Sequence, residues 1–294
     1  MKRSFLARLQ RRAVASLVGA LLLLIIVPLL QILVLGPQGY NAALATPQAN
    51  LAWIQGHTAL FLLYRLALLL GFALLVAMPF ALFRIIIAQE IVGRAELAAE
   101  EGATASEGEE DAEENKNAED QEGDEDAEAG EAEKSEGEEN GLPPNAWRGK
   151  GFAVIAAWTG FLGLLLIVIG ILITSIYLWS SGSIASARAP LPDNYASVTS
   201  IFAVLTYTVG GGLLALTCLF FGIVIARSGR RLWPDSWVAF GYIGMGIGAV
   251  ASGSAVQVAL APAAAQGSLT TPTILLFALW SLWFSIMVVR LKAE

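Results

Sequence analysis

Six apolar stretches, each long enough to cross a lipid bilayer, constrain this sequence more than any other feature. A spanning helix needs about 20 apolar residues, because the hydrocarbon core is about 30 Å thick and a helix rises about 1.5 Å per residue. Backbone polar groups find no water inside lipid, so stretches of this kind must be helical. We place them at approximately residues 13–36, 58–89, 152–179, 201–226, 237–261 and 273–289. The sequence therefore predicts an all-α integral membrane protein with six transmembrane helices.

Two of these stretches allow other interpretations. The fifth is rich in Gly, Ala and Ser rather than Leu, and is the weakest of the six. The first follows a basic N-terminus and precedes Ala43-Leu44-Ala45, which resembles a signal-peptidase site. Its apolar part is about 24 residues long, whereas signal peptides have about 7–15, so we expect it to be retained as a helix. If it were cleaved, five spanning helices would remain.

A strongly acidic segment separates the second stretch from the third. Between Glu96 and Glu139 there are 21 acidic residues against Lys116 and Lys134, out of 25 acidic residues in the whole chain. The segment from Gly102 to Gly141 has no aromatic or branched apolar residue. Such a composition predicts disorder, because it cannot bury enough surface to offset the loss of chain entropy. We expect three parts: residues 1–95, the acidic loop 96–146, and residues 147–294.

Two roles for the acidic loop remain open. It is a solvated spacer, or it docks a basic partner and weakly collects divalent cations. A specific calcium site requires carboxylates in a fixed order, and the loop lacks EF-hand spacing.

Lysine and arginine are concentrated at every second connection between the stretches. They precede the first stretch, flank the acidic loop, follow the fourth stretch and close the chain, whereas residues 37–57 and 262–272 contain none. Basic residues near spans mark the cytoplasmic side, and acidic residues count little. We therefore expect both termini and the acidic loop in the cytoplasm, with the chain in the plasma membrane.

Arg65 is the ionised side chain that stands out within the stretches. One reading places it at the outer membrane surface, where its guanidinium reaches lipid headgroups. The other is an anion site inside the bundle, or an ion pair with Asp193 of the next outer loop. In the same helix, Pro79 predicts a kink.

Glycine concentrates in the fourth and fifth stretches. At helical spacing it lets two backbones approach closely, which is the simpler reading, whereas a broken helix lining a solute site is the functional one. With the polar residues beside them and Arg65, they form the candidate solute or packing site: Arg65, Tyr207, Thr208, Gly210, Gly211, Gly212, Gly244 and Gly248. We expect Trp158, Trp280 and Trp283, which lie away from the ends of their stretches, to pack between helices.

Few reactive side chains lie in the stretches. The chain has one histidine, His57, and one cysteine, Cys218, so a bis-histidine haem or a structural zinc site is not expected. Neither a Walker A loop nor an intramembrane carboxylate for proton relay is present in the sequence. We therefore expect no cofactor and no nucleic-acid partner.

The leading hypothesis is a non-catalytic accessory, scaffolding or assembly protein. Its partners would be the bilayer, another membrane protein, or a basic cytoplasmic protein held by the acidic loop. The alternative is a passive permease for a small neutral or anionic solute, through the second, fourth and fifth helices.

Overall fold

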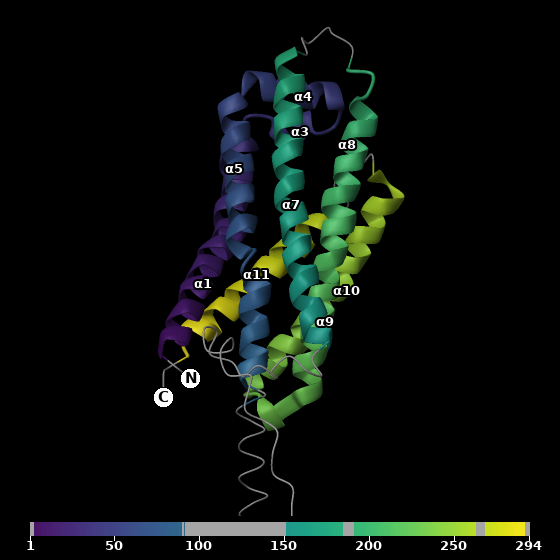
Figure 1. Cartoon of the computed structure of the whole chain (residues 1–294). Coiled ribbons are helices and arrows are strands. Elements are labelled where there is room, and N and C mark those ends of the chain that lie inside the picture. Colours follow the sequence, from purple (N-terminus) through teal and green to yellow (C-terminus); the bar gives the residue numbers. More distant parts are fainter. Residues whose placement is uncertain (1–2, 90, 92–150, 185–190, 263–267, 292–294) are drawn as a thin grey trace, which may run out of the picture.

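The structure is a computed structural model that describes residues 3–89, 91, 151–184, 191–262 and 268–291 (Figure 1). Within these ranges the regular elements are all helical. Six helices are long and apolar enough to cross a membrane, as the sequence predicts: Leu6–Leu35, Thr58–Gln89, Gly151–Gly182, Tyr195–Gly229, Asp235–Leu260 and Thr270–Val289. The acidic loop lies outside the described residues, and its disorder stays a prediction.

The first span is an α-helix that widens into π-helical turns on both sides of a proline. It consists of α1 (Arg3–Leu21), η1 (Leu22–Ile26), α2 (Val27–Leu29) and η2 (Leu30–Leu35). Pro28 lies in the short α2. Because proline donates no backbone hydrogen bond and crowds the preceding turn, a regular α-helix cannot continue past it unchanged.

Two short helices cross the end of the bundle that lies away from the termini. They are α3 (Tyr40–Ala43) and α4 (Pro47–Gly56). Thr46 caps α4, because its hydroxyl accepts a hydrogen bond from the Ala49 N–H at 3.2 Å, and a proline occupies the first helical position. The indole N–H of Trp53 donates to the carbonyl of Gln38 at 2.7 Å, which ties α4 to the turn before α3.

The second span is interrupted where the sequence predicts a kink. Helix α5 (Thr58–Leu75) ends in a turn at residues 76–77, and helix resumes over residues 78–89. Pro79 lies just after the break, as its missing N–H requires. Its ring fits against Gly160 of the third span, where an added Cβ would lie 2.7 Å from the proline Cγ.

The remaining spans follow in chain order. They are α7 (Gly151–Ile184), then α8 (Tyr195–Ala203) continued by η4 (Val204–Gly210) and α9 (Gly211–Leu232), then α10 (Asp235–Leu260) and α11 (Thr270–Val289). Helix α9 bends near its end at Gly229, whose φ of 58° is a left-handed conformation that glycine adopts at little cost.

Glycine contacts set the closest approaches between helices. An added Cβ at Gly222 of α9 would lie 2.6 Å from the Gly241 carbonyl oxygen of α10. Between α7 and the fourth span, a Cβ at Gly163 would lie 2.9 Å from the Gly210 oxygen. Backbones at this distance gain extensive van der Waals contact, which drives helix association in lipid.

The first and last spans bring the chain ends together. Helix α1 packs on α5 and α11, and the amide of Gln10 donates to the Leu291 carbonyl at 3.0 Å. Both termini lie at one end of the bundle in Figure 1.

The three tryptophans expected to pack between helices behave differently. Trp280 is buried and Trp283 is partly buried against the core. Trp158 is 53% exposed, so the expectation is wrong for this residue. It lies on the outer side of α7, where its ring contacts the edge of Phe80 at a centroid distance of 5.4 Å.

Candidate functional site

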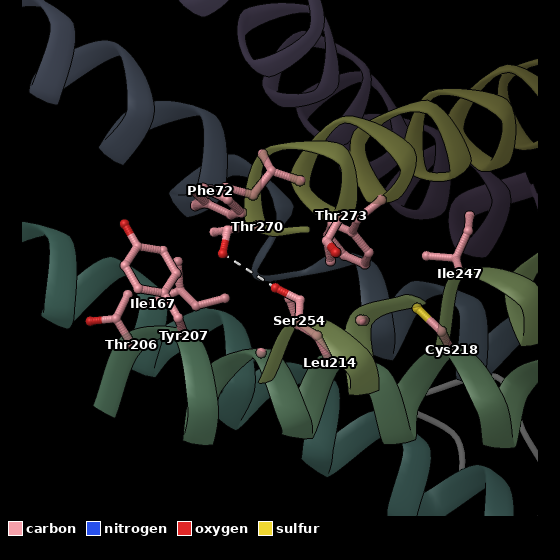
Figure 2. A pocket seen from close by; sticks show the side chains of 14 residues that line it. Phe72, Ile167, Thr206, Tyr207, Leu214, Cys218, Ile247, Ser254, Thr270 and Thr273 are labelled. Atoms are coloured by element: carbon pink, nitrogen blue, oxygen red, sulfur yellow. Dashed lines mark hydrogen bonds between the residues drawn. The ribbon is translucent and has the colours of Figure 1, made fainter. Parts of the chain in front are cut away.

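A small cavity lies inside the bundle where five spans meet (Figure 2). The centre of a water-sized molecule can lie anywhere within a volume of about 40 Å³ in this cavity. Since a single water needs roughly 10–15 Å³ in this measure, the space suits a few waters or one very small molecule. The lining comes from α5, α7, the fourth span, α10 and α11: Phe72, Ile167, Thr206, Tyr207, Gly211, Leu214, Cys218, Ile247, Ala251, Ser254, Thr270, Thr273, Ile274 and Phe277.

The π-helical segment η4 supplies the polar part of one wall. Thr206 and Tyr207 lie in η4, and Gly211 follows as the first residue of α9. π-Helical turns are rare and are frequent at functional sites, because they shift side chains out of the regular helical positions. The hydroxyl oxygen of Thr206 is buried and has no hydrogen-bond partner in the described part of the chain.

Hydroxyl groups from α10 and α11 form the opposite wall. Ser254 Oγ and Thr270 Oγ1 lie 3.3 Å apart, shown as a dashed line in Figure 2, and both side chains are buried. Thr273 turns its hydroxyl to the Leu269 carbonyl at 2.7 Å. Among the described residues, the lining therefore carries neutral hydroxyls and a thiol but no ionised group, so it suits water or a small neutral molecule.

The predicted glycines divide into those with open space and those in contact. At Gly211 and Gly212 an added Cβ would meet nothing within 4 Å, and Gly211 lines the cavity. At Gly210 a Cβ would lie 2.9 Å from Ile167. At Gly244 it would lie 3.2 Å from the Trp280 ring, and at Gly248 2.6 Å from Leu219. Gly210, Gly244 and Gly248 thus serve helix contacts rather than the cavity.

Thr208 joins the fourth span to the fifth. Its hydroxyl donates to the Ala255 carbonyl of α10 at 3.2 Å. This bond holds η4 against α10 directly beside the cavity, whose lining includes the neighbouring Tyr207. Thr208 is therefore a positioning residue for that wall.

Arg65 lies in a separate aromatic group near the short helices α3 and α4. Helix α5 begins at Thr58, about two turns before Arg65. The guanidinium carbon lies 5.3 Å from the centre of the Phe61 ring, within range of a cation–π interaction, and Nε is buried without a partner. Asp193 is exposed in the turn before α8, and these two described residues form no ion pair.

Electrostatics connect this aromatic group to the cavity. Tyr40 is buried, 6.1 Å from the Tyr64 ring, and its burial raises the pKa of its phenol. Arg65 and Tyr207 both lie close enough to act on the pKa of Tyr40, the first lowering it and the second raising it. Arg65 and Tyr207, two of the predicted site residues, thus both influence the pKa of Tyr40, although only Tyr207 lines the cavity.

Much of the polar lining lies outside the candidate site that the sequence predicts. Thr206 and Ser254 stand beside the glycines of the fourth and fifth stretches without belonging to that site, and Thr270 and Thr273 come from the sixth stretch. Serine and threonine are common in membrane helices, so only their convergence from separate spans marks a site. Among the residues described, no group of three His, Cys, Asp or Glu side chains is arranged to hold a metal ion.

Comparison of the chain with protein-family models, with curated proteins and with solved structures finds no significant match.

Proposed function

We propose that this chain is a non-catalytic, multi-pass protein of the plasma membrane that acts as an accessory or assembly component. One observation carries the proposal most: the cavity among five spans has room for a few water molecules, and no ionised side chain lines it in the part of the chain that the structure describes. The interior is otherwise used for helix packing.

The intramembrane hydroxyls support this reading. Thr217, Ser252, Ser281 and Ser285 each donate to a carbonyl four residues earlier in their own helix, at 2.8–2.9 Å. Serine and threonine bonded in this way leave no free donor to coordinate a solute along the bundle axis. Such side chains are suited to close packing rather than to a polar pathway.

The acidic loop is the part we propose to recruit a partner. The basic residues that flank it favour a cytoplasmic position, with both termini on the same side. Its composition favours a disordered segment with a strong negative charge, and such segments attract basic surfaces over distances of about 10 Å at moderate salt. A basic cytoplasmic protein, or a membrane protein with a basic loop, fits this chemistry.

The test compares the full chain with a loop of equal length and no charge. Every Glu and Asp in residues 96–139 is replaced by Gln or Asn, and both proteins are isolated in mild detergent. We expect the natural chain to migrate with a stoichiometric partner that dissociates as salt rises, and the neutral variant to migrate alone. Identical complexes from both proteins would refute recruitment by the loop.

A second candidate is a permease for a small neutral solute. It is favoured by the buried hydroxyls of Ser254 and Thr270, which come from two spans and line a cavity bordered by the open space at Gly211. Neutral hydroxyls can exchange the hydrogen bond between them for one to a passing polar molecule.

Flux measurements in liposomes separate the two candidates. In Gly211→Leu the new side chain fills the cavity, whereas in Gly246→Leu it enters open space on an exposed side of α10. A permease predicts uptake of water, glycerol or urea that falls at least tenfold in Gly211→Leu and is unchanged in Gly246→Leu. Rates equal to those of protein-free liposomes would exclude these solutes.

A further inference from the structure

A larger hollow opens on the side of the bundle, toward the end that holds both termini. It offers about 560 Å³ to the centres of water-sized molecules, far more than the internal cavity. It lies between α1, the second span and α7, and its lining joins two arginines to nine apolar residues: Arg12, Ala73, Val76, Ala77, Phe80, Phe83, Arg84, Val154, Ala157, Trp158 and Phe161. We refer to these residues as the arginine groove.

Two helices bring positive charge to the arginine groove. Arg12 of α1 and Arg84 of the second span line it, and Arg8 lies one turn before Arg12. Both Arg8 and Arg12 are close enough to Arg84 to act on it electrostatically. Asp193 and Asp235 are the acidic residues among those described, and neither lines the groove. Three guanidinium groups in this arrangement repel one another and favour a bound anion.

The rest of the groove is an aromatic wall. The Phe80 ring lies 5.4 Å from the Trp158 ring and 5.5 Å from the Phe161 ring. Trp158 is 53% exposed although it lies within a spanning helix. A wall of this kind offers contact to hydrocarbon chains, which interact with apolar side chains wherever they lie in the bilayer.

The depth of the arginines matches a lipid phosphate. Arg12 lies six residues after Leu6, where the first span begins, and Arg84 lies five residues before Gln89, where the second span ends. Long basic side chains at this depth extend to the headgroup layer while their stems remain among apolar groups. Basic pockets between spanning helices are a known way to hold anionic headgroups.

We propose that the arginine groove binds an anionic phospholipid. Its phosphate lies between Arg12 and Arg84, and its acyl chains lie against Phe80, Trp158 and Phe161. The chain's own acidic loop would pair with the arginines but not with the aromatic wall, because residues 102–141 have no aromatic or branched apolar side chain. A phospholipid supplies a phosphate for the arginines and acyl chains for the aromatic wall.

Native mass spectrometry of the full chain tests the proposal. The protein is offered phosphatidylglycerol or phosphatidylcholine with the same acyl chains, and the lipids that stay bound are counted. We expect a preference for phosphatidylglycerol of about tenfold, which the double variant Arg12→Gln, Arg84→Gln loses. Arg11→Gln is the matched control, because Arg11 is exposed on the same helix and does not line the groove. An equal loss in Arg11→Gln would overturn a specific site.

Two further arms separate the sources of the anion. Inorganic phosphate that displaces phosphatidylglycerol at millimolar concentration would show a free-anion site and overturn the lipid proposal. A lipid preference that appears only after deletion of residues 96–139 would show that the acidic loop occupies the groove, and would also overturn it. We expect neither result.

A second measurement does not depend on the arginine variants. Phosphatidylglycerol with brominated acyl chains should quench the tryptophan fluorescence of the natural chain at a lower mole fraction than brominated phosphatidylcholine. Trp158→Phe should abolish that difference, because Trp158 is exposed in the wall. Equal quenching by the two lipids in the natural chain would contradict the proposal even if the double variant failed to fold.

Discussion

At the scale of the residue, neighbouring glycines in α10 have opposite surroundings. Gly248 faces α9, where a Cβ would lie 2.6 Å from Leu219 and 2.9 Å from the Ala215 carbonyl oxygen. At Gly246 a Cβ would meet nothing within 4 Å. A side chain at 248 must push two helices apart, whereas one at 246 enters open space on the surface of the bundle.

The first prediction follows from this contrast. We expect Gly248→Leu to lower the free energy of unfolding by at least about 1–3 kcal/mol, the usual cost of overpacking. Gly246→Leu should leave it nearly unchanged. The measurement is the midpoint of unfolding in detergent for both variants. Similar midpoints would mean that α9 and α10 are not packed through Gly248.

Trp280 gives a second prediction. Its ring stacks on Phe240 at a centroid distance of 4.5 Å, and its indole N–H donates to the Phe240 carbonyl at 3.1 Å. Trp280→Phe removes the donor and leaves the buried carbonyl without that bond, for which we expect a loss of about 1–3 kcal/mol. Trp283→Phe, at a partly buried position, is the control. Equal losses in the two variants, measured as unfolding midpoints, would argue against this bond.

Tyr40 gives a third prediction, on pH. Burial raises the pKa of its phenol above 10.0, so the folded protein favours the neutral form. The stabilisation is therefore fully present below pH 10 and is lost as the pH rises through the pKa of the folded state. We expect the unfolding midpoint of Tyr40→Phe to fall less steeply above pH 10 than that of the natural chain. Parallel curves would mean that Tyr40 does not titrate in this way.

At the scale of the element, η4 is the segment that departs most from regular helix beside the cavity. It precedes three consecutive glycines and carries Thr206, whose buried hydroxyl lacks a partner in the part of the chain that is described. Segments of this kind cost stability and persist where the surrounding packing holds them. The bond from Thr208 to the Ala255 carbonyl is one such restraint.

The fourth prediction separates these two threonines. Thr206→Val removes an unsatisfied hydroxyl at constant shape, so we expect no loss of stability and a gain of up to about 1 kcal/mol. Thr208→Val breaks a bond between helices and should cost about 0.5–1.5 kcal/mol. Unfolding midpoints of both variants decide the matter. A clear loss in Thr206→Val would show that its hydroxyl has a partner, such as a bound molecule.

At the scale of the whole molecule, an even number of spans places both chain ends together. The contact of Gln10 with the Leu291 carbonyl closes the bundle between α1 and α11. The second span ends and α7 begins at this same end of the bundle (Figure 1). The two residues that flank the acidic segment in the described part of the chain therefore lie on the side of the bundle that holds both chain ends.

The fifth prediction checks that arrangement in cells. In a Cys218→Ser background, single cysteines replace Asp120 in the acidic loop and Asp193 in the turn before α8. We expect a membrane-impermeant maleimide to label Asp193→Cys in intact cells, and to label Asp120→Cys only after permeabilisation. Labelling of Asp120→Cys from outside would reverse the proposed orientation.

The sequence was sufficient for the all-helical architecture, for the number of helices long and apolar enough to cross a membrane, and for the break near Pro79. These follow from local properties: an apolar run of sufficient length must be helical in lipid, and proline must interrupt it wherever it stands. The observed spans lie within a few residues of the expected ranges at most ends.

The tertiary structure alone decided which side of each helix meets a neighbour. In a soluble helix a polar face marks the outside, but these helices are apolar on both the lipid side and the protein side, so their rotation cannot be read from periodicity. Glycine spacing predicted close contacts without naming partners. For the same reason, only the structure placed Gly211 beside a cavity, exposed Trp158, and gathered Arg8, Arg12 and Arg84 from two helices.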